Sequence, residues 1–430
     1  MESSSLSNYN WEKITSGFTS SSWLREKYHT KFEKLAANVS TDVAIIGGGI
    51  AGMTTSYLLA KQGKKISLID DGYIASGESG RTTAHVTVVL DERYYDLEKK
   101  YGKVGTKLVA ESHAAAINLI ESIITNEDIH CDFEKLDGLL FLDASDSSES
   151  LDKELLALHN AGISDAKIII GSPLEHRGIG SCICISNQAQ FNPLKYISGL
   201  AEIITSKYNG DIFTETHVQE INHQYDKCNI KTSNEFKIAA QAAVVASNAP
   251  IVDKVSKIYD KQQAYRSYVI GIKIKKNSIP KSLFWDTGNQ RSKEKIKPYH
   301  YVRIQTKIDD RKNDLLIVGG EDHKTGKVID TKQTEKIFKK LENWARNRFP
   351  VEGPVVYKWS GQIMEPKDGL AFIGASSLQE KNIYIATGYS GNGITYGTIS
   401  GMLISDLILG KRNDWTELYD PGRVIEDTKT

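Results

Sequence analysis

The sequence predicts a mixed α/β fold, α+β overall, that combines a parallel β-sheet with an antiparallel one. Three observations predict it. Residues 43–69 read as a buried strand, a glycine-rich turn, a helix and a second strand. Residues 265–275 and 299–319 alternate apolar and polar side chains, as strands of an antiparallel sheet do. Residues 381–410 repeat the order of strand, glycine turn and helix.

The N-terminal unit gives the strongest of these signals. Residues 43–46 are all apolar, as expected of a strand buried on both faces of a parallel sheet. We expect a helix over 51–62, because Gly63 stands where a helix-ending glycine belongs. Residues 65–69 form the second strand, which ends at Asp70. Together these segments predict one βαβ unit.

The remaining elements alternate between helices and strands. Phe191, Asn192 and Pro193 predict a helix start, since proline is favoured in a first turn. Residues 331–348 predict a charged amphipathic helix. Further helices are expected over 104–126, 150–161 and 194–206, and further strands over 130–143, 242–247 and 383–387.

The overall charge and composition exclude several classes of protein. The chain of 430 residues predicts roughly two to three domains. Lys and Arg number 54, as do Asp and Glu, so no net basic field attracts nucleic acid or an anionic membrane. No apolar run reaches the roughly 18 residues of a membrane-spanning helix, and the N-terminal segment lacks a signal-peptide pattern. We expect a soluble, cytoplasmic protein that binds neither nucleic acid nor membrane.

The cysteines predict neither a metal centre nor a disulfide framework. The four cysteines are Cys131, Cys182, Cys184 and Cys228, and none stands in a CxxC or CxH pattern. The ten histidines show no metal-ligand spacing either. Cys182 and Cys184 are two residues apart in an apolar run, which favours a buried structural role on one face of a strand. We therefore predict no metal site and a reducing compartment.

A glycine fingerprint follows the first predicted strand. Gly47, Gly49 and Gly52 form a GxGxxG pattern between a strand and a helix. The first glycine permits a tight turn, the second lets backbone N–H groups approach a pyrophosphate, and the third lets helix and strand pack closely. Asp70 lies 21 residues beyond Gly49, where a carboxylate binds ribose hydroxyls. The pattern predicts a dinucleotide cofactor at Gly47, Gly49, Ile50, Ala51, Gly52, Asp70 and Asp71.

Two further segments favour FAD over NAD. Residues 76–85 carry small residues, hydroxyls and one arginine, which suit a backbone that runs beside a phosphate and under a flat ring. Residues 388–393 make a second glycine-rich turn ahead of a predicted helix over 394–409. The N-terminus of that helix can stabilise negative charge on a reduced flavin. An ordinary surface loop and a helix-capping turn are the alternatives for the two segments.

With these motifs, residues 40–423 resemble the D-amino-acid oxidase/glycine oxidase superfamily of FAD-dependent oxidoreductases. Within it, the resemblance is strongest to the Rieske-associated and gamma-glutamylputrescine-oxidase-like members. Those Rieske relatives continue where this sequence ends, and no CxH and CxxH pair is present, so no internal iron–sulfur relay is expected. The matching segments are residues 42–52, 80–85, 131–138, 191–193, 319–323, 359–361, 368–374, 386–391 and 418–423.

The resemblance implies a Rossmann-like FAD-binding domain with an inserted antiparallel-sheet substrate domain. FAD is expected to be non-covalent, because Cys182 and Cys184 lie outside the segments that match flavin-binding positions. The implied division is a lead-in over 1–40, an FAD domain over 41–125, 186–260 and 354–423, a substrate domain over 126–185 and 261–353, and a tail over 424–430. The implied further flavin contacts are Arg81, Thr82, Thr83, Ala84, His85, Val218, Gly361, Gly388, Gly391, Asn392, Gly393, Ile394 and Thr395.

The same resemblance implies candidate catalytic residues. In glycine-oxidase-like members one strand carries an arginine that clamps the substrate carboxylate, and Arg303 matches it. Alternation along a strand places Tyr301 on the same face as Arg303, with His300 next to them. His85 would lie near the reacting edge of the flavin and tune substrate protonation. The alternatives are a surface Arg303 paired with the carboxylates at 309–310, and a structural His85.

The sequence therefore predicts an FAD-dependent oxidoreductase that oxidises the C–N bond of a small amino acid or amine. Hydride would pass to flavin N5, and the resulting imine would hydrolyse. Oxygen or an unknown electron acceptor would reoxidise the flavin. Two alternatives stay open, namely an FAD-dependent dehydrogenase of 2-hydroxy acids and a flavin-binding scaffold or assembly factor without turnover. The exact substrate and the oligomeric state are not predicted.

Overall fold

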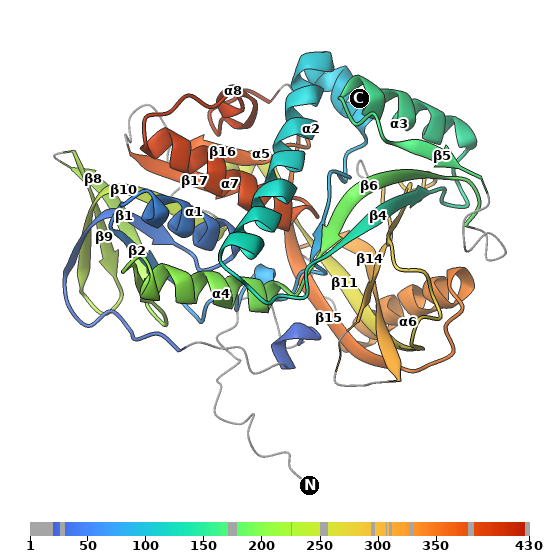
Figure 1. Cartoon of the computed structure of the whole chain (residues 1–430), viewed down its shortest axis with the longest axis horizontal. Coiled ribbons are helices and arrows are strands. Elements are labelled where there is room, and N and C mark those ends of the chain that lie inside the picture. Colours follow the sequence, from blue (N-terminus) through green and yellow to red (C-terminus); the bar gives the residue numbers. More distant parts are fainter. Residues whose placement is uncertain are drawn as a thin grey trace, which may run out of the picture.

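Two β-sheets, each accompanied by helices, form the frame of the protein (Figure 1). The lead-in over 1–40 and the tail over 424–430 lie in large part outside the described residues. Within the described ranges, no helix is long and apolar enough to cross a bilayer. The computed structural model describes residues 20–25, 31–170, 179–224, 226–249, 257–293, 297–306, 308, 312–326, 330–376 and 382–425.

The first sheet has eight strands and a parallel centre. Its order is β16-β17-β10-β1-β2-β7, and β9 joins β10 and pairs in turn with β8. The pairs from β17 through β7 are parallel, whereas β16, β9 and β8 pair antiparallel. The strands are β1 (Val39–Ile46), β2 (Ile66–Ile69), β7 (Asp211–Phe213), β8 (Val218–Gln224), β9 (Lys227–Thr232), β10 (Lys237–Asn248), β16 (Phe372–Ala375) and β17 (Ile383–Thr387).

The predicted βαβ unit is confirmed as β1, α1 (Ile50–Lys61) and β2. β1 pairs on one side with β2 and on the other with β10, so Val43 to Ile46 are buried and apolar. Gly63 has φ +80°, and its N–H donates to the carbonyl of Ala60. This glycine ends α1 as predicted.

Helix α1 packs against α7 (Gly393–Ile408) beside the first sheet (Figure 1). The two helices approach closely because α7 presents glycine at the contact. A Cβ at Gly397 would come within 2.4 Å of Ile50 Cγ2, and one at Gly401 within 2.6 Å of Thr54 Cγ2. The N-terminal and C-terminal segments of the chain are thereby joined.

The second sheet has nine strands and is antiparallel except for the parallel pair β4–β12. Its order is β15-β11-β14-β13-β12-β4-β6-β3, with β5 paired to β6. The predicted alternating segments are strands of this sheet. The strands are β3 (His85–Val86), β4 (Glu134–Phe141), β5 (Lys167–Ile169), β6 (Cys182–Gln190), β11 (Gln262–Lys275), β12 (Leu283–Asp286), β13 (Tyr301–Gln305), β14 (Asn313–Lys324) and β15 (Val355–Pro366).

Helix α6 (Thr331–Arg348) packs on the second sheet and matches the predicted amphipathic helix. Its Phe338 and Leu341 are buried in one core with Ile270 of β11. A capping box of Asp330 and Gln333 begins the helix. The second sheet therefore has a core of its own.

Helix α2 (Tyr94–Asn126) begins earlier than the predicted residue 104. Gly102 interrupts its helical backbone with φ +64°. The regular apolar spacing used for the prediction starts after this kink, whereas the first part is anchored by buried Tyr94 and Leu97. The remaining helices are α3 (Ser148–Asn160), α4 (Pro193–Ser206), α5 (Ile258–Lys261), α8 (Thr416–Tyr419), η2 (Trp23–Arg25) and η3 (Glu78–Gly80).

All four cysteines are buried thiols outside any disulfide. Cys182 and Cys184 lie two apart on β6 in the core shared with α6, which confirms their buried structural position. In the part of the chain that the structure describes, no group of three or more His, Cys, Asp or Glu is arranged to hold a metal ion.

The two sheets divide the chain in nearly the same way as the predicted domains. The exceptions are β15 and β3, which lie in segments assigned to the FAD domain but pair in the second sheet. In addition, β6 crosses the predicted boundary at residue 186. The domain boundaries themselves stay a prediction.

Candidate active site

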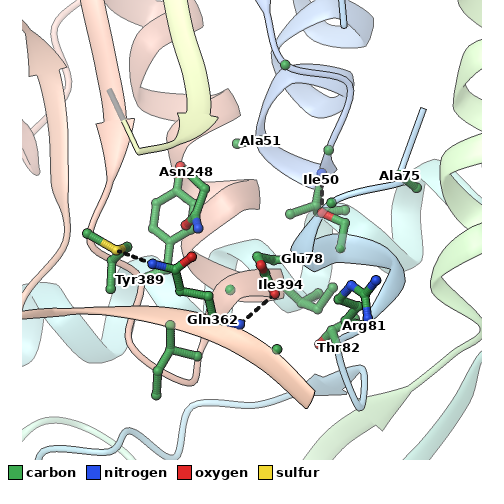
Figure 2. A pocket seen from close by; sticks show the side chains of 18 of the residues that line it. Ile50, Ala51, Ala75, Glu78, Arg81, Thr82, Asn248, Gln362, Tyr389 and Ile394 are labelled. Atoms are coloured by element: carbon green, nitrogen blue, oxygen red, sulfur yellow. Dashed lines mark hydrogen bonds between the residues drawn. The ribbon is translucent and has the colours of Figure 1, made fainter. Parts of the chain in front are cut away.

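A cavity of about 460 Å³ lies between the two sheets. Its lining comes from the start of α1, the end of β2, the segment that follows β2, the start of α7 and strands β11 to β15. Figure 2 shows Ile50, Arg81 and Gln362, which belong to three of these elements, around this space. Each sheet thus contributes a wall.

The glycine turn before α1 has no room for side chains. A Cβ at Gly52 would lie 1.9 Å from the carbonyl oxygen of Gly47, and a Cβ at Gly47 would lie 2.5 Å from that of Ala246. Gly47 also has φ +110°, which L side chains rarely adopt. Gly49 is the N-cap of α1 and supplies no capping side chain. The turn therefore presents a helix N-terminus to the cavity, which is an anion-binding geometry.

Asp70 closes the turn from the end of β2. Its Oδ2 accepts the N–H of Gly48 at 2.6 Å, and its Oδ1 accepts the N–H of Gly72 at 2.8 Å. Burial raises the pKa of this carboxyl, and the two backbone hydrogen bonds oppose that rise. Asp71 is more exposed and lies 3.2 Å from Nδ1 of His217. Both carboxyl groups line the cavity.

Two tryptophan side chains hydrogen-bond to the backbone of the segment that follows β2. Trp359 donates its Nε1–H to the carbonyl of Arg81, and Trp23 donates its own to the carbonyl of Thr82, both at 2.8 Å. Glu78 accepts the backbone N–H of Gln362 at 2.8 Å. These contacts fix the segment between β15 and the N-terminal part of the chain.

A short N-terminal strap, residues 21–24, holds this segment from outside. Ser21 donates its hydroxyl to the carbonyl of Gly80 at 2.6 Å, and Ser22 donates to Gln305 Oε1 at 3.0 Å. Trp23 is 1% exposed. Residues that precede the first strand therefore form part of the wall beside the cavity, a role that the sequence did not predict.

Arg303 does not line the cavity, which corrects the expected carboxylate clamp. Its Nη1 donates to the carbonyls of Thr83, Ala84 and Phe191 at 2.9 to 3.1 Å. The guanidinium also lies 5.2 Å from the ring of Trp23. The residue is neither on the surface nor open to substrate, because the strap and the segment after β2 cover it. The carboxylates at 309–310 lie outside the described residues.

His85 lines the cavity in a fixed, neutral form. Its Nε2 lies 3.2 Å from the carbonyl of Val302, which can only accept, so Nε2 carries the proton. Nδ1 then accepts the hydroxyl proton of Thr83 at 3.0 Å. Burial, and then the positive charge of Arg303, lower the pKa of His85 to about 3. Both ring nitrogens are committed, so this histidine is not placed to take up a substrate proton.

The second sheet gives the cavity an aromatic wall that carries a carboxylate. Trp285, Tyr299 and Tyr301 line this wall, with the two tyrosine ring centres 5.7 Å apart. Tyr301 shares a hydrogen bond of 2.8 Å with the hydroxyl of Ser267. Asp322 lines the same wall, and its Oδ1 is buried without a hydrogen-bond partner.

The turn before α7 closes the opposite end of this wall. The Gly391 N–H donates to Oδ2 of Asp91 at 2.6 Å, and Tyr299 donates its hydroxyl to Oδ1 of the same carboxylate at 2.5 Å. Asn392 donates to the carbonyl of Val89 at 2.8 Å and leaves the start of α7 without a side-chain cap. A second helix N-terminus therefore faces the cavity, as the sequence predicted for 388–394.

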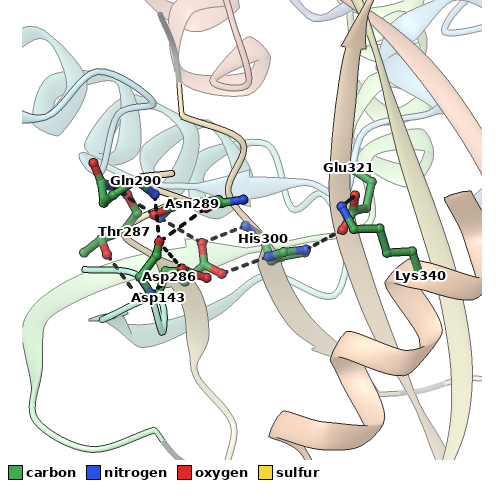
Figure 3. Close-up of polar contacts among 10 residues, drawn as sticks. Asp143, Asp286, Thr287, Asn289, Gln290, His300, Glu321 and Lys340 are labelled. Atoms are coloured by element: carbon green, nitrogen blue, oxygen red, sulfur yellow. Dashed lines mark hydrogen bonds and ion pairs between the residues drawn. The ribbon is translucent and has the colours of Figure 1, made fainter. Parts of the chain in front are cut away.

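His300 is not among the residues that line the cavity. Figure 3 shows it between Asp286 and Glu321. Its Nδ1 is 2.8 Å from Asp286, its Nε2 is 3.2 Å from Glu321, and Glu321 also pairs with Lys340. The ring stacks on Trp344 at 4.0 Å. Burial lowers the pKa of His300, but the two carboxylates outweigh this and raise it to about 9. His300, Asp286, Glu321 and Lys340 thus form a charged cluster with a structural role, and none of them lines the cavity.

The sequence pattern of one protein family, described as DAO: FAD dependent oxidoreductase, matches residues 42–407. The chain belongs to this DAO family. It is accordingly an oxidoreductase, and its cofactor is FAD.

Curated relatives of this DAO-family chain are moderately similar over most of its length. A protein of Bacillus subtilis that is named for a Rieske 2Fe-2S centre is 29% identical, over 91% of this chain and 73% of its own. The gamma-glutamylputrescine oxidoreductase of Escherichia coli is 24% identical, over 89% and 87%.

Solved structures share the fold of the family. Glycine oxidase from Geobacillus kaustophilus superposes with a TM-score of 0.70 at 18% identity, over 90% of this chain and 100% of that one. The L-amino acid deaminase from Proteus vulgaris gives 0.72 at 14% identity, over 92% and 100%. At these identities the likeness establishes the fold alone.

The cavity fits the cofactor of the DAO family. Two helix N-termini face it, one at Gly49 and one at Asn392, and neither N-cap residue caps its helix with a side chain. In the first, the N–H of Ile50 donates to Oγ of Ser79 at 3.0 Å. Oδ1 of Asn392 is buried without a hydrogen-bond partner, which leaves an acceptor for a ligand donor. The glycine turn is too tight for side chains and suits the close approach of a pyrophosphate.

Most of the predicted cofactor residues of this DAO-family chain come together around the cavity. Gly52, Ala84, Gly388 and Thr395 are buried but are not among the lining residues. The lining includes Gly47, Gly49, Ile50, Ala51, Asp70, Asp71, Arg81, Thr82, Thr83, His85, Val218, Gly361, Gly391, Asn392, Gly393 and Ile394. Of the predicted catalytic residues, His85 and Tyr301 line it, and His300 and Arg303 do not.

Several lining residues were missed by sequence reasoning. Tyr299 could have been found, because it stands two residues before Tyr301 in the segment 299–319 that was predicted to alternate. Asp322 stands in a segment that the family resemblance matched, at 319–323, but no spacing rule singles it out. The other missed residues include Glu78, Ser79, Asp91, Ser247, Ser267, Trp285, Gln362 and Tyr389.

The His300 cluster predicts a loss of stability in alkaline solution. Its pKa of about 9 in the folded state exceeds the ordinary 6.5, so its stabilising effect is complete below pH 6.5 and disappears as pH rises through 9. The difference corresponds to about 3 kcal/mol of unfolding free energy. Urea unfolding at several pH values should show this decline in the wild type and much less of it in His300→Gln. His130→Gln, at an exposed histidine, should keep the full decline; an equal decline in His300→Gln would contradict the assignment.

Proposed function

We propose that this DAO-family protein oxidises the C–N bond of a small amine or amino acid. One observation carries the proposal: a single cavity joins the glycine turn at Gly47 to the aromatic wall at Tyr301. A dinucleotide on the first sheet and a small substrate on the second would therefore share one enclosed space. The curated relatives include a gamma-glutamylputrescine oxidoreductase and a glycine oxidase, which supports nitrogen-bearing substrates.

We further propose that FAD spans the cavity from the α1 turn to the α7 turn and is held without a covalent bond. The two helix N-termini would stabilise its negative charge, at the pyrophosphate and at the ring. Asp70 would accept the ribose hydroxyls. The residues assigned to this binding are Gly47, Gly49, Ile50, Ala51, Gly52, Asp70, Asp71, Arg81, Thr82, Thr83, Ala84, His85, Val218, Gly361, Gly388, Gly391, Asn392, Gly393, Ile394 and Thr395.

The protein would position the substrate and exclude water from the reacting groups. Bound FAD supplies the acceptor for a hydride from the carbon next to nitrogen. Tyr301 and Trp285 would enclose the substrate, which must lie with that carbon facing the cofactor. His85 would shape this wall as a neutral ring, since both of its nitrogens are engaged. The reaction needs a neutral amine and little acid–base chemistry beyond it.

An anaerobic spectral titration tests the proposal. The purified protein should be yellow, and amines or amino acids should bleach its visible absorbance. If only 2-hydroxy acids bleach it, the protein is a dehydrogenase of C–OH groups and the proposal is wrong. A yellow protein that no member of the panel bleaches would favour a scaffold without turnover. Oxygen uptake by the substrate-reduced protein then separates an oxidase from a dehydrogenase.

A further inference from the structure

We propose that the substrate amine carries a second positive charge, which Asp322 and the rings of Tyr299 and Tyr301 receive at the aromatic wall. This inference rests on the proposed function and names its substrate class. This class consists of diamines and related amines with a cationic end group. It excludes amino acids that are bound through their carboxylate.

Carboxyl groups gather at this wall. Asp91 and Asp322 line the cavity, and Glu365 of β15 is buried behind them, close enough for their charges to act on it. Oδ1 of Asp322 and Oε2 of Glu365 are buried without hydrogen-bond partners. Burial raises the pKa of Asp322 to about 7, and it raises those of Asp91 and Glu365 as well. Carboxyl groups in this state would be stabilised by a cation placed among them.

The positive side chains described near the wall, His300 and Arg93, lie outside the cavity lining. His300 is held between two carboxylates, as described above. The charge of Arg93 lowers the pKa of Asp91 and also that of buried Glu154. Of the described residues that line the cavity, Arg81 is the one lysine or arginine, and it lies beside Glu78 in the segment after β2. Because Arg303 is covered, a substrate carboxylate at this wall would face carboxyl groups and no arginine.

The aromatic rings complete a cation-binding surface. Tyr299 and Tyr301 lie with their centres 5.7 Å apart beside Asp322. The hydroxyl of each ring is held, that of Tyr299 by Asp91 and that of Tyr301 by Ser267. Rings fixed in this way attract ammonium groups through their π faces, and a nearby carboxylate adds to the attraction.

Asp322 is suited to bind a substrate group that stays positively charged throughout the reaction. A carboxylate next to the reacting nitrogen would hold that nitrogen as ammonium, with no lone pair to assist the loss of hydride. The reacting amine must be neutral, whereas a second ammonium group can remain protonated throughout. The wall therefore fits the non-reacting end of the substrate.

Three amines of matched shape test this proposal in the FAD-loaded protein. Pentylamine, tetramethylenediamine and δ-aminovalerate differ at one end only, which is a methyl, an ammonium or a carboxylate group. Apparent Kd values come from anaerobic reduction at increasing amine concentration. We expect the diamine to bind best and Asp322→Asn to weaken its binding by about 10-fold or more, with little change for pentylamine. Asp322→Glu should keep the preference.

A non-reacting cation provides a readout that is independent of turnover. Tetramethylammonium has no lone pair and cannot be oxidised as an amine, so its binding by calorimetry reports the cation site alone. Asp322→Asn should weaken it by about 10-fold. Asp314→Asn is the matched control, since Asp314 lies on the same strand, accepts the N–H of Asn277 and is outside the cavity lining. Flavin content and unfolding temperature verify that each variant is folded.

The outcomes separate this proposal from the function on which it rests. Tighter binding of δ-aminovalerate than of the diamine would overturn the cation site and leave amine oxidation standing. An equal loss for pentylamine and the diamine in Asp322→Asn would assign Asp322 to the reacting nitrogen and overturn the second charge. Tetramethylammonium binding that depends on Asp322, in a protein that no amine reduces, would support the cation site and contradict the proposed oxidation.

Discussion

Replacing Gly52 with alanine should remove most FAD binding. The added Cβ would lie 1.9 Å from the carbonyl oxygen of Gly47, and 3.3 Å from Ile45 Cγ2 of β1. A backbone oxygen cannot rotate away, so α1 must shift from β1 and open the turn. Overpacking of this kind costs about 3 kcal/mol, which corresponds to roughly 100-fold weaker FAD binding. Fluorescence titration of the apoprotein with FAD measures the change directly.

The matched control for this variant is Gly180→Ala. Gly180 has an ordinary φ, and no atom lies within 4 Å of the position that its Cβ would take. Its FAD affinity should equal that of the wild type, and its stability should stay within about 0.5 kcal/mol. A Gly52→Ala protein that binds FAD with wild-type affinity would refute the role given to the tight turn.

Replacing Trp23 with alanine should destabilise the holoprotein by about 3–5 kcal/mol and speed the release of FAD. The indole is almost fully buried, lies against the guanidinium of Arg303 and donates to the carbonyl of Thr82. Without it, both a cavity and an unpaired backbone carbonyl are left beside the segment that lines the FAD site. Thermal unfolding and the rate of flavin fluorescence recovery after dilution measure the two effects.

Trp23→Phe distinguishes packing from hydrogen bonding at this position. It keeps most of the buried ring and loses the N–H, so we expect a cost of about 1–3 kcal/mol. The FAD release rate should fall between those of the wild type and Trp23→Ala. If Trp23→Ala unfolds at the wild-type temperature and releases FAD at the wild-type rate, the N-terminal strap does not support the cofactor segment.

The part of the fold predicted best is the part whose signals are local. Gly47, Gly52 and Gly63 are required by contacts and backbone angles within a few residues or within one βαβ unit. The prediction of β1, α1 and β2 therefore needed no knowledge of the rest of the chain. The second glycine turn before α7 was predicted for the same reason.

The substrate wall was predicted poorly because its properties depend on what covers each strand. Tyr301 and Arg303 both lie on β13, within a segment that alternation predicted to be a strand. Nothing in that pattern indicates that residues 21–24 reach over the strand at Arg303 and leave Tyr301 open. Trp23 itself stands in a serine-rich segment without periodicity, so its burial had no sequence signal.

The junction of α1 with α7 has a consequence for the biosynthesis of the protein. The glycines at 397 and 401 bring α7 against Ile50 and Thr54, which are synthesised long before it. β17 likewise adds to β10 only after residue 383 has been synthesised. The nascent chain can form β1, α1 and β2 early, but the second helix N-terminus of the FAD site is still missing then. Cofactor capture should therefore be a late event, after the ribosome has released most of α7.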